Sequence, residues 1–213
     1  MKVITSSLAN AFAAAVTKYP AERSSWVELS FQLGGLLPDS ALSWSIQSMG
    51  TLDLAVRAME DEALPVDGTG SDLEIFSMDL QVVLSEMWVG GIYEVTRLLK
   101  ARGLVAGDAF HKLAHDFELV RIPIEKHELP KDDRLKSPLA LSRQPPNNDD
   151  TDIYIYSRND PKRAHIAPKG LSERGSLMWH VLDHLADKSW WLERRSLSER
   201  FLSLSVPQSG LSA

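Results

Sequence analysis

One arginine and one histidine, six positions apart, have the side-chain types needed for acid–base chemistry on a phosphate. Arg121 and His127 stand in the run R-I-P-I-E-K-H. A histidine can transfer a proton near neutral pH, and an arginine can stabilise the charge that develops on a phosphate under attack. Arg121 and His127 are therefore the candidate catalytic residues for cleavage of RNA without a metal ion. Arg174 and His180 repeat the spacing, so spacing alone does not single out one pair.

Histidines also occur twice at the i, i+4 spacing that lets two imidazoles on one helix face bind zinc. His111 and His115 form the first pair, and His180 and His184 form the second. The first pair lies opposite the apolar face of its predicted helix, which indicates a solvated surface. The second pair meets on one side only in a helix, whereas the alternating apolar residues around it favour a strand. We therefore expect no metal site and no cofactor.

Basic side chains surround a predicted β-hairpin in the last third of the chain, at Arg158, Lys162, Arg163, Lys169 and Arg174. Tyrosines lie in the same hairpin, and basic groups beside aromatic rings can bind single-stranded RNA through phosphate contacts and stacking. The alternative is a solvated hairpin whose tyrosines pack on the helices. These five residues are the candidate nucleic-acid-binding residues of an RNA-binding module.

A polar and aromatic edge follows the longest predicted helix, with Trp88, Tyr93, Glu94 and Arg97. Glu94 and Arg97 are three residues apart, within reach of an ion pair. Because the opposite face is apolar, this helix is expected to be covered on both sides. The four residues then form either a buried polar network or an interface with a partner, and an active site is the third alternative.

Two family resemblances rest on these motifs. The string W-V-x-x-x-Y-E-x-x-R (88–97), together with the run 121–128 and the late Arg194-Arg195 pair, resembles an uncharacterised bacterial protein family with no assigned activity. The spacing of Arg121 and His127 is similar to the R-x4–6-H motif of HEPN-type ribonucleases. That second resemblance implies a homodimer in which the arginine and the histidine cleave RNA at the interface without a metal ion.

A helix over residues 71–102 is the main element that must position these groups. Ser71 and Glu74 form a capping box at its start. The residues of its predicted buried stripe recur at helical spacing: Leu80, Val83, Leu84, Met87, Gly91, Val95, Leu98 and Leu99. Two adjacent glycines inside a helix each cost about 1 kcal/mol relative to alanine. Gly90-Gly91 therefore indicates the close approach of a second helix.

The remaining pattern predicts shorter elements on both sides of this helix. Helices are expected at 8–19, 24–33, 40–62 and 108–122, with Glu60, Asp61 and Glu62 as a solvated helix end. The β-prone segment 153–156 is expected to pair with 165–167, and alternation favours a strand at 177–183. A last helix is expected at 190–204.

These elements predict a predominantly helical α+β fold: a helical bundle around a long central helix, a small C-terminal antiparallel sheet and a final helix. The expected organisation is a bundle over 1–136, a polar loop over 137–152, a hairpin or sheet with a helix packed on the bundle over 153–206, and a flexible tail over 207–213.

Composition and charge exclude several classes of protein. The chain has 213 residues, 44% of them apolar, and no cysteine, which excludes disulfides and favours a reducing compartment. Residues 1–80 carry four basic and eleven acidic side chains, so the net charge of −6 comes from this part of the chain. The negative net charge argues against nonspecific nucleic-acid binding. No segment has the 20 or so continuous apolar residues of a membrane span, and polar residues interrupt any signal-peptide core.

No nucleotide-binding glycine loop and no G-x-S-x-G serine elbow is present. We therefore expect a soluble cytoplasmic interaction or regulatory protein without an evident catalytic site. It is expected to be a homodimer, with a further protein partner as an alternative and no membrane contact. The HEPN-like ribonuclease and the RNA-binding module remain the alternative functions.

Overall fold

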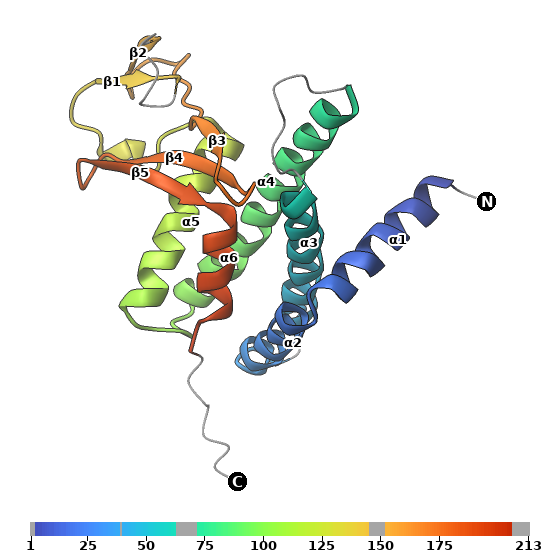
Figure 1. The fold of residues 1–213 in the computed structure, drawn as a ribbon. Coiled ribbons are helices and arrows are strands. Elements are labelled where there is room, and N and C mark those ends of the chain that lie inside the picture. Colours follow the sequence, from blue (N-terminus) through green and yellow to red (C-terminus); the bar gives the residue numbers. More distant parts are fainter. Residues whose placement is uncertain (1–2, 39, 63–71, 145–151, 206–213) are drawn as a thin grey trace.

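The computed structural model describes residues 3–38, 40–62, 72–144 and 152–205, with backbone alone for 72–75 (Figure 1). The α-helices of this part are α1 (Val3–Lys18), α2 (Pro20–Gly35), α3 (Leu42–Glu62), α4 (Asp72–Ala101), α5 (Asp108–Lys126) and α6 (Arg194–Leu202). The strands are β1 (Leu139–Ser142), β2 (Ile153–Tyr156), β3 (Lys169–Leu171), β4 (Leu177–Asp183) and β5 (Lys188–Glu193). The predicted α+β class is confirmed.

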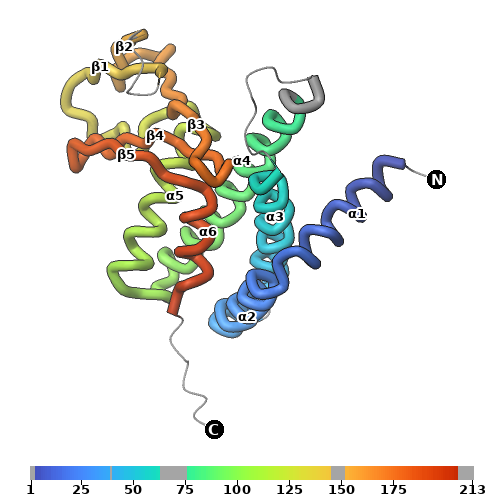
Figure 2. The backbone as a smooth tube through the Cα atoms, in the orientation of Figure 1, coloured from blue at the N-terminus to red at the C-terminus, as the bar shows by residue number. Residues whose placement is uncertain are grey.

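The long helix α4 is the central element of the bundle. It runs without a break for 30 residues, which confirms the predicted helix at 71–102, although the capping box at Ser71 and Glu74 lies outside the described side chains. Helices α3 and α5 pack against it, and Trp88, Ile92 and Leu99 face the core that they share. Figure 2 shows α1 leaving this bundle, so that its first turns project beyond the rest of the chain.

Glycines allow helices to approach closely, as at Gly91 and Gly50. A Cβ on Gly91 would lie 2.2 Å from the Sδ of Met49 on α3, and a Cβ on Gly50 would lie 2.6 Å from the ring of Trp26 on α2. Neither separation leaves room for a side chain. The prediction that Gly90-Gly91 marks the close approach of a helix is therefore confirmed.

The strands form two antiparallel sheets. β4 lies between β3 and β5 in the larger sheet, with Trp179 opposite Leu192 and Val181 opposite Trp190. Trp179 and Val181 are buried, and β4 contacts α4 and α5, so one face of this sheet closes the bundle core. The predicted strand at 177–183 is confirmed. β1 and β2 form a separate two-stranded ribbon beyond the sheet (Figure 1).

One predicted β pairing and the predicted polar loop differ from the structure. The strand at 153–156 pairs with β1, which lies inside the expected polar loop 137–152, and not with 165–167. Ala140 and Leu141 supply the short apolar run that the loop assignment overlooked. Within that expected loop, residues 145–151 lie outside the described part of the chain, as do 207–213 of the expected tail.

The final helix is shorter than predicted. Residues 188–193 form strand β5, and α6 begins only at Arg194. The turn between β4 and β5 contains Asp187 in the left-handed region, with φ 52°, and this turn brings Trp190 and Trp191 beside β4. Aromatic residues favour a pleated, half-buried surface, and this preference outweighs the helical spacing of the same residues. No helix of the described ranges is long and apolar enough to cross a membrane.

Candidate functional site

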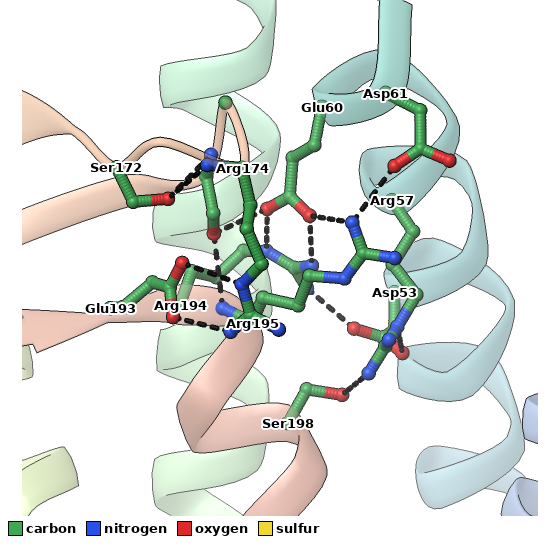
Figure 3. A network of polar contacts seen from close by, with 12 residues as sticks. Asp53, Arg57, Glu60, Asp61, Ser172, Arg174, Glu193, Arg194, Arg195 and Ser198 are labelled. Atoms are coloured by element: carbon green, nitrogen blue, oxygen red, sulfur yellow. Dashed lines mark hydrogen bonds and ion pairs between the residues drawn. The ribbon is translucent and has the colours of Figure 1, made fainter.

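Four charged side chains meet in the interior between α3 and α6 (Figure 3). On α3, the Nε of Arg57 donates to the Oδ2 of Asp53 at 2.8 Å. On α6, Arg194 binds both carboxylate oxygens of Glu60, at 2.6 and 2.9 Å, and its third nitrogen donates to Asp53. All four side chains have at most 2% of their surface exposed. We call Asp53, Arg57, Glu60 and Arg194 the buried ion network.

Neutral donors and acceptors complete the bonding of this network. Ser176 donates to Glu60 at 2.6 Å, and Trp26 donates from its indole nitrogen to Asp53 at 2.9 Å. Arg57 donates to the hydroxyl of Ser198 at 2.9 Å. The ring of Trp88 lies 5.3 Å from the guanidinium of Arg194, within the range of a cation–π contact. The network therefore joins α2, α3, α4, α6 and the turn before β4.

Burial and charge act in opposite directions on the protonation of the network. Burial would raise the pKa of Asp53, but Arg194 and Arg57 outweigh it and hold that pKa below its ordinary value. Burial would likewise lower the pKa of Arg194, and the charges of Asp53 and Glu60 raise it instead. Asp53 and Arg194 are therefore ionised at neutral pH, and each compensates the charge of the other.

This arrangement fits a clamp between elements better than a reaction centre, because the charged groups are enclosed and already bonded to one another. The expected solvated end at Glu60, Asp61 and Glu62 is wrong for Glu60, which is fully buried against Arg194. The sequence does contain a signal for the burial of Glu60. Asp53 and Glu60 continue the helical spacing of the apolar positions before them, so α3 carries charges on its core-facing side.

The two candidate catalytic residues, Arg121 and His127, lie in different surroundings. Arg121 forms ion pairs with Glu125 at 2.5 Å and Glu94 at 3.7 Å, and its guanidinium lies 4.9 Å from the ring of Tyr93. His127 is exposed at the C-cap of α5 in the left-handed region, with φ 55°. Binding a phosphate would require Arg121 to leave both carboxylates. Metal-independent RNA cleavage by this pair stays a prediction, tested by comparing the chain with His127→Ala.

The candidate nucleic-acid-binding residues are mostly engaged by acidic groups. Arg163 binds Asp132 and Glu128, each at 2.8 Å. Lys169 pairs with Glu86, and Arg174 pairs with Glu193 and Glu199. Arg158 donates to the backbone carbonyl of Asp133, and Lys162 is exposed. The basic cluster of the sequence is therefore largely compensated in charge.

The aromatic and polar edge of α4 divides between core and surface. Trp88 is fully buried, whereas Tyr93 is half-buried. Glu94 and Arg97 are exposed and pair with each other at 2.7 Å. Burial raises the pKa of Tyr93, so this phenol stays protonated. The four residues do not form one buried network, because only Trp88 contacts the core charges.

In each of the two histidine pairs, one member binds a group elsewhere in the fold. His115 binds Asp183 at 2.8 Å, and His184 donates to the carbonyls of Pro130 and Lys131, at 3.0 and 3.1 Å. Within the described ranges, no group of three or more histidine, aspartate or glutamate side chains could hold a metal ion.

The first half of α4 exposes apolar side chains, three of which the sequence pattern placed in the core. Phe76, Leu80, Val83 and Met87, which we call the α4 stripe, are 64%, 37%, 51% and 60% exposed. The buried face of the same turns contains the polar residues Gln81 and Ser85 instead. Gln81 donates to the carbonyl of Gly175 at 2.7 Å, which fixes the rotation of the helix. The predicted buried stripe is therefore wrong for Leu80, Val83 and Met87.

No family model, curated protein or solved structure matches this chain. The resemblance to a bacterial family through the 88–97 string and the similarity to HEPN-type ribonucleases both stay predictions.

Proposed function

We propose that this chain is a cytoplasmic interaction or regulatory protein that acts as a homodimer and uses the α4 stripe as its dimer surface. The observation that supports the proposal is the exposure of Phe76, Leu80, Val83 and Met87 along one face of a helix. Apolar side chains gathered on an accessible face are typical of protein interfaces. The buried ion network is enclosed and its groups are bonded to one another, which favours a structural role for it.

The spacing of the α4 stripe supports a helix as the occupant. Its residues follow one another at four, three and four positions, which places them on one side of an α-helix over about 16 Å. This is the a/d spacing by which two helices pack side by side. None of the four side chains carries a charge, so pairing two stripes buries no unpaired ion.

A second copy of the chain is the occupant that requires the fewest additional assumptions. A two-fold axis brings the same surface of both protomers together, so an apolar stripe that suits helix pairing is complementary to itself. Further along the same face, Glu94 and Arg97 compensate each other within one protomer, at 2.7 Å. The polar continuation of the stripe therefore adds little repulsion between copies.

The test is the solution mass of the full chain, measured by sedimentation velocity at protomer concentrations from about 1 to 100 µM. We expect a concentration-dependent dimer for the natural sequence. Val83→Glu places a charge in the middle of the α4 stripe and is expected to yield a monomer with an unchanged helical circular dichroism spectrum. Since Val83 is half-exposed in the single chain, the substitution leaves the bundle core intact.

Met78→Glu is the matched control. Met78 is also exposed, at 46%, but lies on the side of α4 away from the stripe. It adds the same charge to the same helix and is expected to leave the dimer intact. A monomeric natural chain at the highest concentration, or equal dissociation by both variants, would contradict the proposal.

A further inference from the structure

A small hollow separates the β1–β2 ribbon from the three-stranded sheet. It has a volume of about 220 Å³, and its lining includes Ser142 of β1, His165 and Pro168 of the connection before β3, His180 of β4 and Ser189 of β5. We call it the histidine hollow. Two imidazoles, one from the connection before β3 and one from β4, therefore line one hollow that none of the predicted sites includes.

His165 is held rigidly in the wall of this hollow. Only 4% of its surface is exposed, and its backbone amide donates to the carbonyl of His127 at 2.7 Å. Its ring stacks on Tyr154, with 6.5 Å between centroids, and its Nδ1 lies 2.6 Å from the Tyr154 hydroxyl. The other ring nitrogen, Nε2, is buried and has no hydrogen-bond partner among the described residues.

The protonation of His165 and Tyr154 bears on which ring nitrogen is a hydrogen-bond donor. Burial, with the nearby His180, lowers the pKa of His165 to about 4, so the ring is neutral at pH 7. Burial raises the pKa of Tyr154 to about 12, so the phenol keeps its proton. The contact between the Tyr154 hydroxyl and Nδ1 fits either tautomer of the ring. We assign the donor role to Tyr154, which places the ring proton of His165 on Nε2. A buried donor without an acceptor is costly, and a ligand oxygen would remove this cost.

Positive charge lies next to this donor. A second hollow of about 450 Å³ shares Pro168 with the first and is lined by Tyr154, Arg143 and Lys169. The guanidinium of Arg143 lies 4.8 Å from the ring of Tyr154. Among the described lining residues of both hollows, the formally charged side chains are these two basic ones.

The acidic partners of these two basic groups do not line either hollow in the described part of the chain. Asp152 bonds to Arg143 at 3.0 Å, with both side chains more than half exposed, and Glu86 pairs with Lys169. An exposed pair of this kind is weak and readily exchanged. Arg143 is therefore available to a bound anion at little cost.

We propose that the histidine hollow binds a small oxyanion, a carboxylate or a phosphate, whose oxygen accepts a hydrogen bond from the Nε2 of His165. Ser142 and Ser189 lie in the same lining and offer hydroxyl donors to further oxygens. Arg143 supplies attraction from the adjoining hollow. His180, whose pKa is also lowered by burial, lines the same hollow. This site is independent of the α4 stripe and of dimer formation.

The test is a histidine-ring ¹H–¹⁵N NMR spectrum of the full ¹⁵N-labelled chain, titrated with inorganic phosphate and, in a separate series, with acetate. Before titration, His165 should show a proton on Nε2 and none on Nδ1. Either anion should shift this Nε2 resonance with saturation below about 50 mM. Saturation by phosphate alone assigns a phosphate ligand, and saturation by acetate alone assigns a carboxylate.

Three variants make the result specific. His165→Gln should weaken binding at least tenfold, read from the ring resonances of His180. Arg143 is exposed, so Arg143→Gln should not disturb the fold. This variant should weaken binding about three- to fivefold, as expected for an exposed charge. His111→Gln, which changes an exposed histidine on α5, should leave affinity unchanged.

Three outcomes would overturn the proposal. The first is a proton on Nδ1 of His165. The second is a lack of saturable shift with both anions. The third is a Zn²⁺ titration that removes the Nε2 proton and binds both imidazoles, which would assign the hollow to a metal.

Discussion

Arg194 is the residue on which the buried ion network depends. It neutralises two carboxylates at once, and both are fully enclosed. A buried ion pair is weak evidence for net stability, but removing one partner leaves charges that neither water nor protein compensates. Replacing Arg194 is therefore expected to destabilise the fold far more than replacing an exposed arginine.

Arg194→Met tests this dependence. It leaves Asp53 and Glu60 with only part of their positive partners, and we expect it to lower the free energy of unfolding by about 3–5 kcal/mol. Urea unfolding followed by circular dichroism measures the change. Arg174→Gln, which breaks more exposed pairs with Glu193 and Glu199, is expected to cost less than about 1 kcal/mol. Equal losses for both would contradict the enclosed character of the network.

Asp61 makes the stability of the chain depend on pH. Burial alone would raise its pKa, but hydrogen bonds from Tyr19, Arg195 and Lys18 lower it to about 2. Since the pKa of an unfolded aspartate is about 3.9, the folded state gains stability above that pH and loses it as the pH falls towards 2. With an allowance for solvent screening, the contribution is about 1 kcal/mol.

Asp61→Asn removes this titration. Its free energy of unfolding should be lower than that of the natural chain at pH 6, and the difference should shrink as the pH falls to 2. Urea unfolding at several pH values provides the comparison. A difference that stays constant between pH 6 and pH 2 would exclude the assigned role.

At the scale of elements, the packing of α2 on α3 depends on a glycine. Gly50 lies against the ring of Trp26, which in turn stacks on Phe201 of α6 at 5.5 Å and donates to Asp53. Trp26 is almost fully buried and its ring is fixed on both sides. The distance between the two helices is therefore set by a missing side chain.

Gly50→Ala is expected to destabilise the chain by about 1–3 kcal/mol, because overpacking outweighs the gain of about 1 kcal/mol in helix propensity. Thermal unfolding gives the sign directly. Gly35→Ala is the matched control, because a Cβ there meets no atom within 4 Å, and the change should be neutral or stabilising. A stabilised Gly50→Ala would show that the helices separate without cost.

The rotation of α4 about its axis also depends on contacts between elements. Helical spacing in the sequence gives a stripe but not the neighbour that covers it. The hydrogen bond from Gln81 to Gly175 directs a polar residue inward, and the α4 stripe then faces outward. Hydrophobic periodicity could not anticipate this, since the partner carbonyl lies 94 residues away.

For the whole molecule, net charge and charge pairing together predict the response to RNA. The chain carries −6 overall, and Arg163, Lys169 and Arg174 are paired with carboxylates. Binding to single-stranded RNA would have to break these pairs, so few counterions would be released. We expect weak binding with a shallow salt dependence.

Fluorescence anisotropy with a labelled RNA oligonucleotide, at 50 and 200 mM salt, checks this expectation. A loss of affinity of about 10³-fold or more between these concentrations would indicate many phosphate contacts and would revive the RNA-binding module. Lys162→Gln, at the exposed basic position of the hairpin, should then reduce that salt slope.

The sequence by itself determined the class of the fold, the central helix, the close approach at Gly91 and the strand at 177–183. These features follow from local spacing, helix and strand preference, and the absence of a side chain at glycine. It also supplied the basic and histidine residues, but not their partners. Arg163 and Glu128 are 35 residues apart, and Arg194 and Glu60 are separated by 134.

The tertiary structure alone decided which charges are enclosed, which face of α4 meets water and which imidazoles share a hollow. Glu60 and Glu94 both follow helical patterns, yet one is buried against Arg194 and the other is exposed. His165, in the connection before β3, and His180 of β4 line one hollow together with residues of β1 and β5. Burial and charge compensation depend on neighbours distant in the chain, and a one-dimensional pattern does not contain those neighbours.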